Sequence, residues 1–165
     1  MSANSDSRRA AKRMEMHGKK LVNVDPFETG LLPHADYRSQ EDRPLSPAQF
    51  VEQFVGTMFV NWLALKTSGF FLDHEIGLSL NEGGAYFVGA SPSVRVGFGS
   101  PAHIPHPSLL PVISKHFAVL VDRYLRGEVD SAALEAEKAR NRYADKVEHC
   151  RMAWINASCR KANRQ

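Results

Sequence analysis

The sequence lacks any long uninterrupted hydrophobic run. Although 43% of the 165 residues are hydrophobic, no stretch approaches the roughly 18 to 20 apolar residues that a membrane-spanning helix needs. Residues 1–20 also lack the apolar stretch that follows the basic residues of a secretory signal. We therefore expect a cytoplasmic protein that makes no membrane contact.

Cysteine is scarce, with Cys150 and Cys159 as the two examples. Both fall on one predicted helix, about 13 Å apart at the usual rise per residue, which is too far for a disulfide. Cys150 lies in the apolar stripe of that helix, whereas the adjacent His149 faces elsewhere. We therefore interpret Cys150 as a buried structural thiol and not as a nucleophile.

The sequence also lacks the motifs of common catalytic and cofactor sites. Its glycines match neither a Walker A loop nor a dinucleotide-binding fingerprint. Two polar clusters remain, Asp73-His74-Glu75 and the pair His103 and His106. Neighbouring strand residues point to opposite faces, and a metal site needs three or four convergent ligands. We expect no catalytic residue, no metal and no cofactor, and we recognise no family; whether the two histidines join a site stays open.

Charge is abundant but unevenly distributed. The net charge is +3, yet residues 1–20 contain six Lys/Arg and two acids, and residues 138–165 contain eight and two. These ends therefore have net charges of +4 and +6, and the part between them has −7. Such asymmetry predicts contact with a polyanion, or basic ends that fold back on an acidic middle.

The clearest element is a helix that begins after Ser46. Ser46, with Gln49 three residues later, forms a capping-box pattern, and proline follows the cap directly. The body of the helix is apolar on almost every side, so we expect it to be central and buried. In particular, we expect Phe59 and Trp62 to be buried.

The remaining pattern predicts a small sheet and further helices. Alternating residues in 75–99 favour three short antiparallel strands in a meander, and Ser108 can cap a helix that Gly127 ends. A third helix, capped by Asp130 or Ser131, has one apolar stripe through Cys150 and Trp154.

We therefore predict an α+β fold with a buried central helix, a three-stranded antiparallel meander and two C-terminal helices. The predicted organisation is a mobile basic arm at 1–20, a single α+β domain at 21–160 and a basic tail at 161–165.

Basic residues on the polar side of the third helix are the most informative functional feature. Lys and Arg on a solvated face can neutralise phosphates without reading sequence. The alternative is a salt-bridged surface helix, because Asp145 and Glu148 are interleaved with the basic residues. The candidate phosphate-contacting residues are Arg140, Arg142, Lys146, Arg151, Arg160, Lys161 and Arg164, together with Arg8, Arg9, Lys12 and Arg13 in the N-terminal arm.

These observations favour a non-enzymatic binding subunit, an accessory component of a protein–nucleic acid assembly. Such a subunit would bind a protein partner and contact the phosphate backbone with little sequence readout. The first alternative is an adaptor or inhibitor that binds another protein without touching nucleic acid. The second is an enzyme with a histidine-based site, which would require His74, His103 and His106 to converge.

Overall fold

The structure is a computed structural model that describes residues 21–22, 24, 37–39, 42–68, 76–81, 83–91, 94–99 and 103–164. It has a mixed α+β fold that is mostly helical, which confirms the α+β class. The arm at 1–20 and the Asp73–Glu75 cluster lie outside the described residues. The elements, in chain order, are α2 (Pro47–Thr67), β1 (Gly77–Asn81), β2 (Gly84–Ser91), β3 (Val94–Gly99), α3 (Leu109–Leu125), α4 (Ser131–Arg140) and α5 (Tyr143–Ala162).

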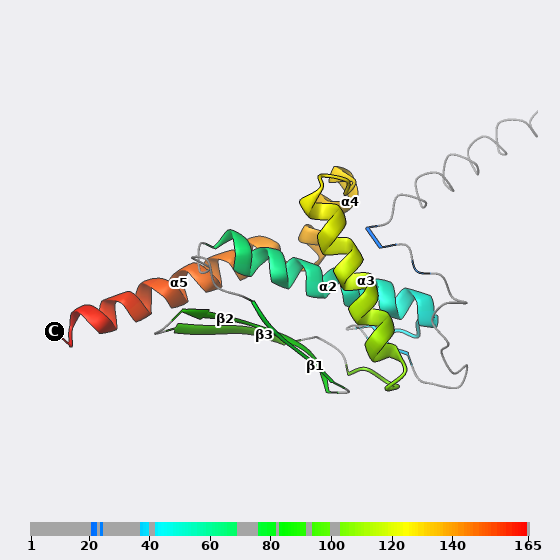
Figure 1. The fold of residues 1–165 in the computed structure, drawn as a ribbon, viewed down its shortest axis with the longest axis horizontal. Helices are drawn as coiled ribbons and strands as arrows, with labels where there is room; N and C mark the ends of the chain where they lie inside the picture. The colour runs from blue at the N-terminus through cyan, green and yellow to red at the C-terminus, as the bar shows by residue number, and fades with distance from the viewer. Residues whose placement is uncertain are drawn as a thin grey trace, which may run out of the picture.

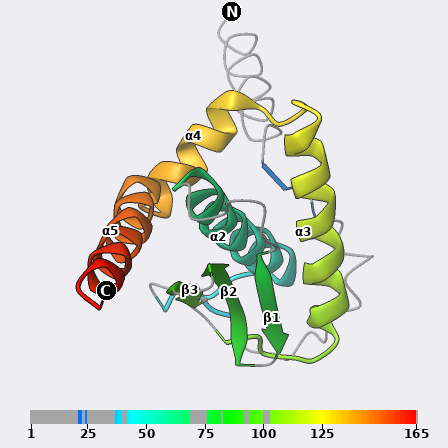
Figure 2. The ribbon, with the colours of Figure 1, turned by 60° about the vertical axis from the view of Figure 1, so that its left-hand side comes forward.

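Helix α2 begins at the predicted capping box. The Ser46 hydroxyl accepts a hydrogen bond from the Gln49 backbone N–H at 3.2 Å, and the Gln49 side chain accepts one from the Ser46 N–H at 3.0 Å. Figure 2 shows α2 with α3 on one side, α5 on the other, the sheet below and α4 above. This position explains why most of its side chains from Phe50 to Leu65 are buried.

The two aromatic residues expected in the core, Phe59 and Trp62, are buried to different degrees. Phe59 is fully buried, as predicted. Trp62 is only half-buried, because it lies at the edge of the interface between α2 and α3. Its ring stacks on Phe59 at 5.8 Å and meets the edge of Tyr124 on α3 at 6.0 Å.

The described strands form an antiparallel sheet in the order β1-β2-β3. Phe87 on β2 pairs with Phe98 on β3, so both side chains lie on the same face of the sheet. Phe87 is buried and packs on Phe117 of α3 at 5.2 Å. Tyr86 lies on the opposite face, where 44% of it is exposed. The inner face thus packs on the helices, and Phe98 lies at the side of the sheet next to α5.

Helix α3 follows Ser108 and ends before Gly127, whose φ of 72° suits glycine at a helix end. Ser108 occupies the cap position, but its hydroxyl does not cap the helix. It lies 2.7 Å from His106 Nδ1 instead. The buried side of α3 consists of Leu109, Ile113 and Leu120.

The prediction of one continuous third helix is wrong. The chain breaks after α4, where Arg142 has a left-handed φ of 54°, and then resumes as α5. Three helices therefore follow the sheet, where two were predicted. On α4 the residues that pack against the core are Ala133 and Leu134, and on α5 Cys150 is fully buried. Figure 1 shows that α5 runs alongside α2 and that its last turns extend past the sheet.

None of the helices in the described part of the chain combines the length and the apolar character needed to cross a bilayer.

Candidate anion-binding groove

An open groove of about 440 Å³ lies where the break between α4 and α5 faces β3. Three of the predicted phosphate-contacting residues, Arg140, Arg142 and Lys146, line it, and so does His149. Asp145 is the single carboxylate among the described lining residues. The lining residues are Phe98, Arg140, Asn141, Arg142, Asp145, Lys146 and His149, and we call this feature the α4–α5 groove.

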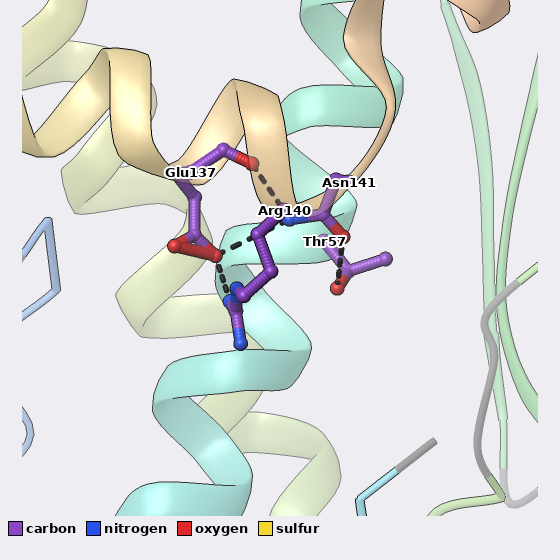
Figure 3. Close-up of polar contacts among 4 residues, drawn as sticks. All are labelled: Thr57, Glu137, Arg140 and Asn141. Atoms are coloured by element: carbon purple, nitrogen blue, oxygen red, sulfur yellow. Dashed lines mark hydrogen bonds and ion pairs between the residues drawn. The ribbon is translucent and has the colours of Figure 1, made fainter. Parts of the chain in front are cut away.

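A buried hydrogen bond fixes the position of the helix break. Thr57 Oγ1 on α2 donates to Asn141 Oδ1 at 2.8 Å, and both residues are buried. Asn141 Nδ2 donates to the Glu137 backbone carbonyl at 3.0 Å, which satisfies one acceptor at the end of α4 (Figure 3). The Glu137 carboxylate in turn contacts the Arg140 guanidinium. Asn141 thus attaches the end of α4 to α2 and places the flanking arginines at the groove.

Lys146 is the cation with the least solvent around it in this groove. Its Nζ contacts Asn61 Oδ1, a buried amide oxygen on α2. It also lies 5.9 Å from the centre of the Phe98 ring. Burial lowers the pKa of Lys146 from 10.5 to about 8. Among the described residues, no carboxylate forms a salt bridge with Lys146, so its charge is partly desolvated without a matching negative charge.

The two arginines of the groove pair with acids close to them in the chain. Arg142 Nη2 lies 2.8 Å from Asp145 Oδ2, and its side chain is 81% exposed. Arg140 pairs with Glu137, and partial burial lowers the pKa of Arg140, with the charge of Glu52 opposing that shift. Exposed ion pairs contribute little free energy. The Arg142 guanidinium can therefore exchange its carboxylate for a phosphate at small cost. The Arg140 pair is different, because only 15% of the Glu137 side chain is exposed, and a buried carboxylate that loses its partner is costly.

The other C-terminal candidates do not join the groove. Arg151 forms a two-bond pair with Glu148, at 2.9 and 2.8 Å, and this hydrogen bonding lowers the pKa of Glu148. Arg151 lies about 140° around the helix from Lys146, which divides the basic residues between two faces. Arg160 shares the face of Lys146 but lies about 21 Å further along α5.

Two other groups of candidate cations have no described position at the groove. Arg164 follows the end of α5 and is exposed. The side chain of Lys161 lies outside the described part of the chain, as do the arm residues Arg8, Arg9, Lys12 and Arg13.

Sequence reasoning missed three residues that shape the groove: Asn61, Phe98 and Asn141. Asn61 is an amide on an otherwise apolar helix, and that isolated polar residue is a signal for a buried partner. Asn141 is a poor helix former in the middle of a helical pattern and a common residue at helix ends. Phe98 gave no signal beyond an ordinary strand position.

The remaining candidate groups are placed separately. His103 Nδ1 lies 3.1 Å from the Gly83 carbonyl oxygen, and His106 Nδ1 faces Ser108. Within the described residues, no three His, Cys, Asp or Glu side chains are grouped to hold a metal. Burial raises the pKa of the Cys150 thiol to about 11. Cys150 is fully buried, as expected.

No family model, curated protein or solved structure compared with this chain matches it.

Proposed function

We propose that the protein is a non-enzymatic binding subunit of a protein–nucleic acid assembly, and that it contacts phosphate through the α4–α5 groove. The observation that supports this proposal is the position of Lys146. Its ammonium is partly desolvated, shares the groove with Arg142, and has an amide oxygen as its hydrogen-bond partner. A phosphate in the groove would supply the negative charge that the described protein residues do not.

Arginine side chains in the groove can also bind phosphate. A guanidinium presents a planar fork of donors that matches two phosphate oxygens, and a lysine contributes a point charge. Arg142 directly follows Asn141, so the tether through Thr57 holds this arginine in the same groove as Lys146. Such contacts position a nucleic acid backbone and carry no base information. Arm residues 1–20, with a net charge of +4, would add affinity of the same kind.

The test is a binding titration at several salt concentrations on duplex DNA, single-stranded DNA and RNA. Each phosphate neutralised on duplex DNA contributes about −0.9 to the slope of log affinity against log salt. Lys146→Gln and Arg142→Gln should each weaken binding and flatten the slope by about that amount. Arg126→Gln is the matched control, because Arg126 is an exposed, acid-paired arginine at the end of α3.

If no nucleic acid binds at low salt, the proposed function is wrong for the isolated chain. Equal slopes of log affinity against log salt for the wild type and the two groove variants would mean that any binding takes place at another surface.

One observation favours the adaptor function as a second candidate. Trp154 lies one helical turn after the buried Cys150, yet 41% of it is exposed. An exposed tryptophan is a frequent anchor in protein interfaces. Trp154→Ala should then abolish recovery of a protein partner in a nuclease-treated pull-down, whereas Lys146→Gln should not. The reverse result favours nucleic acid.

A further inference from the structure

Phe98 gives the α4–α5 groove an aromatic wall among its cations. The residue lies on β3, at the side of the sheet that faces α5. Its ring is partly exposed and lies 6.0 Å from the His149 ring at an angle of 56°. Lys146 Nζ lies 5.9 Å from the same ring centre. An aromatic face and a desolvated ammonium are therefore available to one ligand in one groove.

The Phe98 ring and the Lys146 ammonium together favour single-stranded over duplex nucleic acid. Proteins that hold single strands combine cations that follow the backbone with aromatic side chains on which bases stack. In a duplex the bases are already paired and stacked within the helix, so their faces cannot reach Phe98. We propose that the α4–α5 groove binds one nucleotide of a single-stranded nucleic acid, with its base against Phe98 and its phosphate on Lys146 and Arg142.

The dimensions agree with such a ligand. A volume of about 440 Å³ lies within the range of roughly 300 to 1,000 Å³ found for small-molecule sites. The Lys146 contact with the Phe98 ring is near the outer limit of about 6 Å for a cation–π interaction. A base can displace that contact at little cost, because the ammonium keeps its hydrogen bond to Asn61.

This inference rests on the proposed function, so its test must separate base stacking from phosphate contact. The probes are a labelled single-stranded DNA, an abasic strand of the same length and a duplex, each titrated by fluorescence anisotropy. The abasic strand has the same phosphates and no bases. Wild-type protein should bind the single strand more tightly than the abasic strand.

Phe98→Leu keeps an apolar side chain and removes the aromatic face. This variant should lose about fivefold or more of its affinity for the single strand and none for the abasic strand. Phe98→Tyr should restore the affinity. Tyr86→Leu is the matched control, because Tyr86 is an exposed aromatic residue on the opposite face of the same sheet.

Each contrary result has a distinct meaning. If the single strand, the abasic strand and the duplex bind equally, and Phe98→Leu changes nothing, the stacking inference is overturned and phosphate contact stands. If Phe98→Leu weakens the single strand and the abasic strand equally, the ring shapes the groove without stacking, and the inference is again overturned. If none of the probes binds at low salt, the proposed function fails together with the inference.

Discussion

At the scale of the residue, Lys146 links the stability of the fold to pH. Its pKa is about 8 in the folded state, below its ordinary value of 10.5. The folded protein therefore binds fewer protons at this site than the unfolded chain between those two values. The free energy of unfolding should rise with pH in this window, because stability increases wherever the unfolded state binds more protons.

Replacing Lys146 with methionine should remove this dependence on pH. Urea denaturation at pH 7.5 and 9.5 should show a smaller rise in unfolding free energy for Lys146→Met than for the wild type. The other charged or titratable groups around Lys146 are Arg140, Arg142, Asp145 and His149, and all four remain in the variant. Lys66→Met, at an exposed position on α2, should keep the wild-type rise. An undiminished rise in Lys146→Met would mean that this ammonium is fully solvated.

At the scale of the element, the hydrogen bond from Thr57 to Asn141 holds the helix break on α2. Thr57→Val keeps the shape of the side chain but removes the donor, which leaves a buried amide oxygen unpaired. This loss should lower the free energy of unfolding by about 1–3 kcal/mol, measured by urea denaturation. Affinity for single-stranded DNA should fall as well, because Arg142 directly follows the tethered residue.

Thr57→Ser is the control for this prediction, because it keeps the hydroxyl and removes only a methyl group. It should retain most of the affinity for single-stranded DNA. Equal affinity of Thr57→Val and the wild type would show that the tether does not position Arg142.

The elements also show what local sequence can and cannot predict. Ser46 and Gln49 lie three residues apart, and their capping box predicted the start of α2 directly. The break after α4 was not predicted, because the helical pattern continues through it and Arg142 is not a glycine. What fixes the break is a contact between Thr57 and Asn141, which lie 84 residues apart. Such a contact depends on how the helices pack and leaves no local pattern.

At the scale of the whole molecule, the groove depends on assembly of the fold. Phe98 comes from β3, Asn61 from α2 and Lys146 from α5. The charge pattern predicted Arg140, Arg142 and Lys146 as candidates but did not separate them from Arg151, because residue order alone does not show which helix face is covered. A groove of this kind should therefore disappear when the core that joins these elements is loosened.

Phe59 connects that core, since its ring packs on Trp62 of its own helix and lies 5.5 Å from Tyr124 of α3. Phe59→Ala should lower the free energy of unfolding by about 3–5 kcal/mol, the usual range for removing a buried phenylalanine.

Two single-tryptophan proteins can show whether α2 and α5 lose stability together in Phe59→Ala. Trp154→Phe leaves Trp62 as the reporter of α2, and Trp62→Phe leaves Trp154 as the reporter of α5. If residues 21–160 form one cooperative domain, both fluorescence signals should change at the same urea concentration, and Phe59→Ala should shift both equally. A Trp154 signal that stays in place while the Trp62 signal shifts would mean that α5 unfolds independently, and a groove built on both helices would then not persist as a unit.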